Sequence, residues 1–289
     1  MLSNLINGIS LGSVYAIIAL GYTMVYGIAK MLNFAHGDVI MVGGYIAYCA
    51  FSYLGLGAIP SIIAAIIVCT CLGIVIEKLA YKPLRSATSL AVLITAIGVS
   101  YFLQNAALLI WTSNPKSFPA MVGSGSFQLG SATVSYTALI TIIVCIIIMI
   151  GLTLFTSKTK MGKAMRAVSE DKAAAQLMGI NVNGTISLTF AIGSGLAAIA
   201  GVLLCSAYPT LMPTTGSMPG IKAFTAAVFG GIGSIPGAML GGILLGIIEI
   251  FAKAYISTQF SDAIVFAVLI IVLIVKPTGL LGKKISEKV

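Results

Sequence analysis

The sequence predicts an all-α membrane protein, a polytopic bundle of about eight transmembrane helices that forms one domain over residues 1–289. Hydrophobic residues make up 59% of the chain and charged residues 8%, whereas a soluble domain carries roughly 25% charged residues. Apolar runs of about 20 residues, enough to cross a bilayer, follow one another from end to end. Gly, Pro and polar residues interrupt the pattern at two places, which predicts broken or re-entrant helices.

Eight apolar runs are the expected helices. A helix satisfies its backbone hydrogen bonds internally, and the runs are too long for barrel strands. The first run is also too long for the apolar core of a cleaved signal peptide, so we expect it to remain as the first helix. The runs fall near residues 5–29, 37–54, 58–80, 88–111, 134–157, 186–208, 221–251 and 259–275.

Basic residues between the runs predict how the chain is oriented. Loops rich in Lys and Arg face the cytoplasm, and three places carry them, near residues 78–85, 158–172 and 276–288. The segments 112–133 and 209–220 hold only one basic residue between them and are expected outside. We therefore expect a multi-pass protein of the inner membrane with a cytoplasmic C-terminus.

The run at residues 221–251 contains a break at Phe229–Gly237, FGGIGSIPG. Pro and clustered Gly interrupt a helix, so we expect two half-length helices there. The segment before this run is expected outside and the C-terminal tail inside, so the chain must cross the membrane an odd number of times between them. The last run supplies one crossing. The broken run must then add either none, as a re-entrant pair with both ends outside, or two, as short tilted crossings.

A matching break falls in the N-terminal half, at Lys30–Asp38. Non-helical backbone at membrane depth occurs where protein buries it or where it lines a wet cavity, and corresponding breaks in two halves are typical of internal repeats in transporters. We therefore predict an internal repeat and a translocation path lined by both breaks. The predicted path residues are Asn33, Phe34, His36, Gly37, Asp38, Gly230, Gly231, Gly233 and Pro236.

His36, the one histidine, lies between Asn33 and Asp38. Ionisable groups inside a membrane are costly and often functional. In one interpretation Asn33 or Asp38 caps the next helix and His36 bonds a freed carbonyl group. In others the group lines or gates the path, or His36 relays protons or binds a metal. We predict no metal site, because the sequence places no partner ligands beside it.

Glu249 and Lys253 are four residues apart near the end of an apolar run. This spacing and order favour an ion pair on one helix face, which we expect to be structural. The alternative is a carboxylate that couples transport to protons. Lys222, at the start of the broken run, is expected to extend to the lipid headgroups, with attraction of a carboxylate as the alternative.

The longest basic loop, about residues 158–185, predicts a docking element for a cytoplasmic partner. Good helix formers predict a short helix over 170–178, with Glu170 and Asp171 at its start and Gly179 placed to end it in a left-handed conformation. Its exposed apolar residues would form a small knob suited to docking. The alternative is a helix lying on the membrane surface. The knob residues are Ala174, Leu177 and Met178.

Other classes of function are disfavoured. The chain has no phosphate-binding loop of the G-x-x-x-x-G-K-S/T type, so we expect no catalytic residues and no cofactor here, with ATP and Mg²⁺ on partner chains. The net charge of +9 does not indicate nucleic-acid binding, because the basic residues are confined to loops that suit lipid headgroups and partner subunits. The five Cys lie inside apolar runs, where thiols pack as small hydrophobes.

Three stretches resemble a known family: INGISLGSVYAIIALGYTMVYGIAKMLNFAHGDVIMVGGY (6–45), GKAMRAVSEDKAAAQLMGIN (162–181) and GIKAFTAAVFGGIGSIPGAMLGG (220–242). They are similar to the permeases of branched-chain amino-acid ABC transporters, specifically the LivH-like subunit, over essentially the whole chain. The resemblance implies a heterodimer with a related second permease, two ATP-binding subunits and an extracytoplasmic substrate-binding protein. It also implies that Glu170–Gly179 couples to the ATPase, although Glu170-Asp-Lys-Ala-Ala departs from the Glu-Ala-Ala pattern of importers.

The implied function is that of a permease subunit, not an enzyme, in an importer of leucine, isoleucine and valine. Related systems also carry urea, short amides and other amino acids, so those substrates stay open. A proton-coupled secondary transporter that uses Glu249 or His36 and a passive channel are less favoured, because neither explains the ordered cytoplasmic loop.

Overall fold

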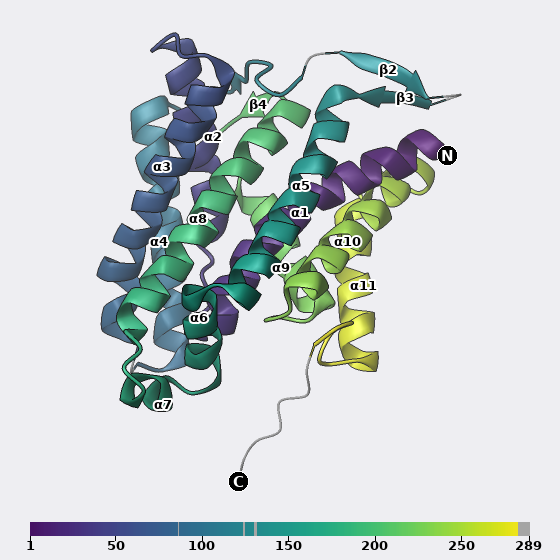
Figure 1. The fold of residues 1–289 in the computed structure, drawn as a ribbon. Coiled ribbons are helices and arrows are strands. Elements are labelled where there is room, and N and C mark those ends of the chain that lie inside the picture. Colours follow the sequence, from purple (N-terminus) through teal and green to yellow (C-terminus); the bar gives the residue numbers. More distant parts are fainter. Residues whose placement is uncertain (86, 124, 130–131, 283–289) are drawn as a thin grey trace.

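The fold is a helical bundle, seen in a computed structural model that describes residues 1–85, 87–123, 125–129 and 132–282 (Figure 1). The α-helices of these residues are α1 (Leu2–Ala29), α2 (His36–Ser52), α3 (Ala58–Ile76), α4 (Ser89–Trp111), α5 (Tyr136–Lys158), α6 (Lys160–Glu170), α7 (Lys172–Leu177), α8 (Val182–Ala207), α9 (Ser217–Gly230), α10 (Ile235–Tyr255) and α11 (Ser261–Val275). A π turn, η1 (Glu77–Tyr81), and a 3₁₀ turn, η2 (Lys82–Leu84), extend α3.

Six helices are long and apolar enough to cross a membrane: α1, α3 with its extension, α4, α5, α8 and α10. The predicted all-α membrane bundle is confirmed. The shorter α2, α9 and α11 lie between or after these six, with 17, 14 and 15 residues.

Short strands, which the sequence did not predict, occur only in connections among the described residues. β1 (Lys116–Ser117) pairs with β4 (Thr210–Leu211), and β2 (Ser126–Leu129) forms a hairpin with β3 (Ala132–Ser135), both antiparallel. The first pair ties together the two segments expected outside.

The core of the bundle is formed by α1 and α8, whose apolar stretches are 94% and 83% buried by the rest of the chain. In contrast, α4 and α5 are only 17% and 22% buried although they are strongly apolar. Apolar helices with open sides are expected where the surroundings are lipid or another membrane chain. The bundle therefore has a closely packed centre and an apolar periphery.

Small residues let α1 and α10 pack closely. A Cβ added to Gly8 would lie 2.9 Å from the Cα of Ile247, and one added to Gly12 would lie 2.6 Å from the Cα of Ile243. Gly242 packs in the same way against the backbone of Ala16. Small residues four apart form one stripe on a helix, and such stripes allow membrane helices to approach. The N-terminal half of α1 is thereby fixed against α10.

The two ends of the bundle differ in charge. We call the end that carries α6, α7, the η1–η2 turn and residues 276–282 the basic face; β1, β4 and the β2–β3 hairpin lie at the opposite face (Figure 1). The ammonium group of Lys172 donates to the carbonyl oxygen of Ala29 at 2.9 Å, which places the end of α1 at the basic face. Three further lysines expected at this face, Lys283, Lys284 and Lys288, lie outside the described residues.

The break predicted in run 221–251 is confirmed, with α9 ending at Gly230 and α10 beginning at Ile235. Gly231 and Gly233 have φ of +107° and +93°, values that favour glycine. The break lies at the basic face, because the amide of Leu280 donates to the carbonyl oxygen of Phe229 at 2.9 Å. The chain therefore runs to the basic face along α9 and back along α10, which fits the alternative of two short crossings and not a re-entrant pair. α9 has 14 residues and α10 has 21, so only α9 has the half length expected.

Candidate functional site

The first break separates α1 from α2. Lys30 has a left-handed backbone (φ 58°) and ends α1, and α2 begins at His36 after the N-cap Ala35. The predicted capping by Asn33 or Asp38 is wrong, because no side chain caps α2. Instead, both polar side chains are buried and used for contacts between helices.

Those contacts tie the start of α2 to the neighbouring helices. The Tyr81 hydroxyl donates to Asn33 Oδ1 at 2.9 Å, and Gln104 Nε2 donates to Asp38 Oδ1 at 2.9 Å. Asn33 is therefore bound to the extension of α3, and Asp38 to α4. A buried polar group without a partner destabilises a fold, so these bonds account for polar residues in an apolar setting.

His36 lies in the interior, 1% exposed. Its ring makes an edge contact with Tyr22, with centroids 4.7 Å apart, and it packs over Gly21, where an added Cβ would lie 2.6 Å from His36 Cε1. Its Nε2 atom has no hydrogen-bond partner among the described residues. The described residues also contain no group of three potential metal ligands.

The start of α2 meets the start of α9. A Cβ on Gly37 would lie 2.8 Å from the carbonyl oxygen of Gly216 and 3.4 Å from the Cα of Gly220. Beside this contact, Phe34 packs against Phe224 with ring centroids 5.4 Å apart. Two short helices that begin inside the molecule thus begin against each other.

The second group of predicted path residues lies elsewhere. A Cβ on Gly27 would lie 3.3 Å from the Cα of Gly233, whereas His36 packs over Gly21. Six residues separate these positions on α1, roughly 9 Å along a helix. The two groups of predicted path residues therefore lie at different depths: Gly230, Gly231, Gly233 and Pro236 lie towards the basic face, and His36 and its neighbours lie deeper. The segment that lies against the first break is the start of α9, a contact that the sequence did not predict.

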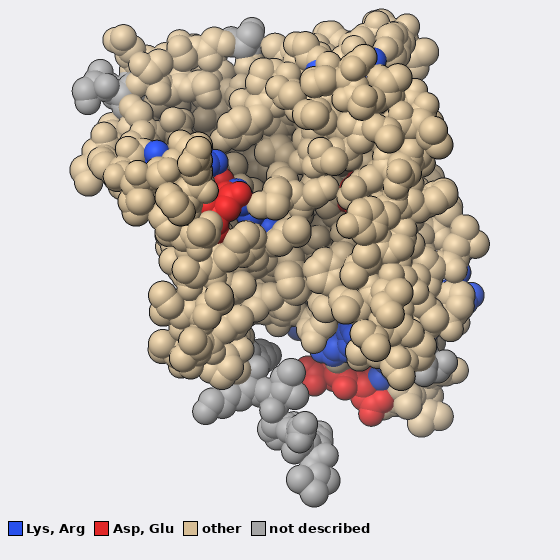
Figure 2. All heavy atoms as spheres, turned by 180° about the vertical axis from the view of Figure 1, so that it is seen from behind, with Lys and Arg blue, Asp and Glu red and all other residues tan. Residues whose placement is uncertain are grey.

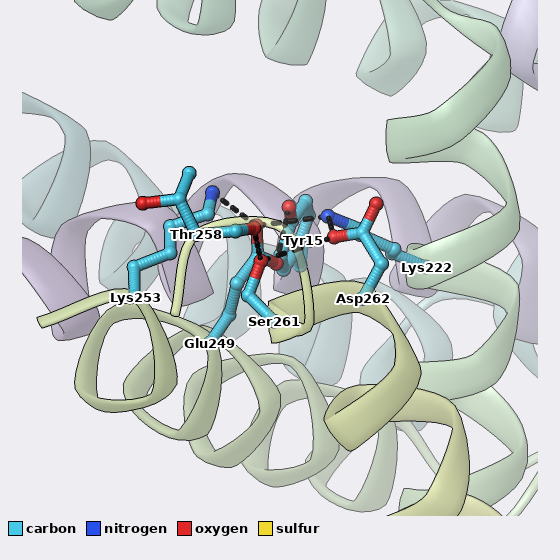
Figure 3. A network of polar contacts seen from close by, with 7 residues as sticks. All are labelled: Tyr15, Lys222, Glu249, Lys253, Thr258, Ser261 and Asp262. Atoms are coloured by element: carbon cyan, nitrogen blue, oxygen red, sulfur yellow. Dashed lines mark hydrogen bonds and ion pairs between the residues drawn. The ribbon is translucent and has the colours of Figure 1, made fainter. Parts of the chain in front are cut away.

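A cluster of charged side chains joins α1, α9, α10 and α11; Figure 3 draws it, and we call it the charged cluster. Glu249 Oε1 accepts from Lys222 at 2.8 Å and from Lys253 at 2.6 Å, while Glu249 Oε2 accepts from the Tyr15 hydroxyl at 2.8 Å. Lys222 also contacts Asp262 Oδ1 at 2.7 Å.

The charged cluster confirms one expectation and corrects another. The predicted pair of Glu249 and Lys253 is present. Lys222 does not extend to the headgroups, because its side chain is only 7% exposed and lies between two carboxylates. The sequence signal was four charged residues in three apolar helices, Lys222 in α9, Glu249 and Lys253 in α10 and Asp262 in α11, but their meeting depends on how these helices pack.

A cavity of about 220 Å³ opens beside the charged cluster. Polar lining comes from Tyr15, Lys222, Glu249 and Lys253, and Leu11, Leu204 and Met218 supply apolar walls. Tyr208 and Thr210 place it towards the face opposite the basic one.

The short helix predicted over residues 170–178 is present but begins later than expected. Glu170 is the last residue of α6, and Asp171 is the N-cap of α7, accepting from the amide of Ala174 at 2.9 Å. Gly179 (φ +80°) follows α7, as predicted. The Gly179 amide donates to the carbonyl oxygen of Gln176, and the Ile180 amide donates to the carbonyl oxygen of Ala175. These two bonds make a Schellman ending.

The knob predicted on α7 is exposed. Leu177 is 90% exposed and Met178 is 83% exposed, and Ala174 is exposed beside them. The knob residues project from the basic face, where Figure 2 shows charged side chains gathered at the lower end of a mostly uncharged surface.

Polar contacts connect α7 and its surroundings to the bundle. One is the bond from Lys172 to Ala29 described above. In addition, the buried Glu77 pairs with Arg85 and accepts from the Ser187 hydroxyl at 2.6 Å. A cavity of about 260 Å³ lies here, lined in part by Arg85 and Lys172. Burial, together with the neighbouring cations Arg85 and Lys30, lowers the pKa of Lys172. Sequence reasoning missed Glu77, since nothing marks it apart from one acid at the end of an apolar run.

Comparison with known proteins identifies the family. A family model described as the permease component of branched-chain amino acid transport systems matches residues 4–273. The chain is 48% identical to the permease protein BraD of a high-affinity branched-chain amino acid transport system from Pseudomonas aeruginosa, over 100% of this chain and 98% of that protein. It is 45% identical to the permease protein LivH from Escherichia coli K12, over 100% and 97%.

Solved structures share the fold. PsaBC from Streptococcus pneumoniae, in complex with a Fab, superposes with a TM-score of 0.50 at 15% identity, covering 96% of this chain and 92% of that one. An inward-facing conformation of a proposed metal-chelate type ABC transporter gives a TM-score of 0.51 at 17% identity, covering 95% and 87%. At such identities the likeness concerns the fold alone. The match of the family model over nearly the whole sequence, and relatives of almost half identity along its full length, place this chain in the family of branched-chain amino acid transport system permease components.

Proposed function

We propose that the chain is the membrane-spanning permease subunit of an ATP-driven importer of branched-chain amino acids. The observation that carries the proposal is the family match over residues 4–273, together with relatives of that named function at 45–48% identity. Substrate passes through this subunit without a chemical step, and ATP is hydrolysed on other chains.

The basic face is the cytoplasmic side in this proposal, because Lys and Arg concentrate in cytoplasmic loops. The C-terminus is then cytoplasmic, and residues 116–117 and 210–211 lie outside. Two ATP-binding subunits dock at the basic face, a second homologous permease completes the membrane part, and an extracytoplasmic binding protein delivers substrate to the opposite face.

The knob on α7 is the contact with an ATP-binding subunit. Leu177 and Met178 are apolar, and water reaches 90% and 83% of their surfaces in this chain alone, so covering them stabilises a complex. When ATP draws the two ATP-binding subunits together, α7 moves with them. The bond from Lys172 to the end of α1 passes this motion to the central helix of the bundle.

The meeting point of α2 and α9 is the element that changes between outward-open and inward-open states. Gly37 and Gly216 pack backbone against backbone with no side chain between them. Such a contact can separate or slide without repacking large side chains. The path residues near His36 lie directly beside it.

Uptake of labelled leucine into cells that express the whole gene cluster tests the proposal. Accumulation should be lost when the ATP-binding subunits carry an inactivating substitution, and excess valine should compete. Accumulation that survives in the inactive variant would refute ATP-driven import, and uptake of urea or short amides without leucine would change the substrate.

A further inference from the structure

The charged cluster places ionisable groups within apolar helices. Glu249 is 1% exposed and Lys222 is 7% exposed, whereas Lys253 and Asp262 are 33% and 42% exposed. Figure 2 shows acidic and basic side chains together in a hollow of the surface, well above the charged lower end. Ionisable residues in membrane helices face protein or a water-filled cavity and commonly mark a substrate path. The hollow is therefore a poor surface for lipid tails.

The lysines of the cluster retain hydrogen-bonding capacity. Each ammonium group has three N–H donors. Within the described residues, Lys222 uses two, on Glu249 and Asp262, and Lys253 uses one, on Glu249. Both line the cavity of about 220 Å³, whereas Asp262 does not. The lining thus carries two ammonium groups with N–H donors that the described residues leave free and one carboxylate, while Asp262 pairs with Lys222 from outside the lining.

The rest of the cavity lining is suited to an aliphatic group. Leu11, Leu204 and Met218 form its apolar walls. Ligand sites combine mainly apolar walls with a few polar groups that fix orientation. A carboxylate against the two lysines would direct an attached hydrocarbon chain along these walls.

We propose that this cavity is a substrate site that takes an aliphatic α-amino acid, with its carboxylate on Lys253 and Lys222 and its side chain against Leu11, Leu204 and Met218. The inference rests on the proposed function and adds to it a site within this subunit. Glu249 holds the two lysines in place and faces the α-ammonium group of the ligand, since its Oε2 accepts only from Tyr15 among the described residues. The site lies near the face opposite the basic one, so substrate released by a binding protein meets it first.

Direct binding tests this site. The assembled importer, without its binding protein, is placed in nanodiscs of phosphatidylcholine alone, so that no anionic lipid competes for the lysines. Labelled leucine should bind saturably, and leucinamide, which lacks the carboxylate, should compete at least about tenfold less well than leucine, because hydrogen bonds to charged groups contribute enough to change affinity by this factor or more. Equal competition by leucinamide, or no saturable binding, would overturn the site.

Variants add a second measurement. Lys253→Met should weaken leucine binding about tenfold or more, and Lys253→Arg should restore most of it. Lys276→Met is the control, since it removes a lysine at the basic face and none from the cavity lining, and its affinity for leucine should stay within about twofold. Met218→Phe should reduce binding by filling the cavity. Unchanged affinity for leucine in both Lys253→Met and Met218→Phe would refute the site. The proposed function is judged separately, by ATP-driven uptake in the wild type.

Discussion

Replacing Leu177 and Met178 together by Asp should detach the ATP-binding subunit while leaving the bundle intact. The two side chains are 90% and 83% exposed, so they stabilise little within this chain, and almost their whole surface is available to a partner. Fully burying a side chain of this size contributes about 1.5–3 kcal/mol, which gives about 3–6 kcal/mol for both. Docking should therefore weaken by a factor on the order of 10² to 10⁴.

The assay measures how much ATP-binding subunit copurifies with the tagged permease from detergent-solubilised membranes, alongside leucine uptake by whole cells. Both should fall, while the amount of permease in the membrane and its melting temperature stay unchanged. Gln176→Glu is the control, because it adds a negative charge to the same exposed helix without removing apolar surface. Normal copurification and uptake in the double variant would refute the docking role of α7, and an equal loss in Gln176→Glu would show that charge alone is responsible.

Three further outcomes follow from single contacts. Tyr15→Phe removes a hydrogen bond to a buried carboxylate and should destabilise the protein by about 1.5–3 kcal/mol in thermal unfolding, whereas Tyr45→Phe should be neutral or stabilising, because the Tyr45 hydroxyl is buried and has no partner among the described residues. Gly37→Ala places a Cβ 2.8 Å from the carbonyl oxygen of Gly216 and should lower thermal stability, by about 1–3 kcal/mol, and uptake. Gly98→Ala, with open space around it, should lower neither. Lys172→Met should leave ATP hydrolysis by the complex intact but raise the ATP consumed per leucine imported, and an unchanged ratio would exclude the bond to α1 from coupling.

The sequence predicted those parts of the fold that depend on local chemistry. Runs of apolar residues predicted the helices, and Gly and Pro predicted the break after Gly230, because the backbone there requires φ values of +107° and +93° at Gly231 and Gly233. Gly179 likewise ends α7 as expected. Such features are set by residues close in sequence, so no knowledge of the packing is needed to see them.

Contacts between distant helices could not be predicted in this way. Lys222 at the edge of an apolar run has the same local pattern whether it extends to lipid headgroups or turns inward. Its position is decided by Glu249 and Asp262, 27 and 40 residues later in the chain. For the same reason Asp38, which could have capped α2, bonds Gln104 instead. A buried polar group takes whichever partner the tertiary structure supplies, and local propensity is overridden.

α1 shows why the positions of these contacts matter for transport. Tyr15 in its middle bonds the charged cluster, and Ala29 at its end accepts from Lys172 of α7. Fourteen residues separate the two, roughly 21 Å of helix. This stretch is helical throughout and closely surrounded, and packed interiors shift between discrete arrangements instead of bending continuously. We therefore expect a displacement of α7 at the basic face to move the lining of the cavity at the opposite face as well, because one continuous helix contacts both proposed sites.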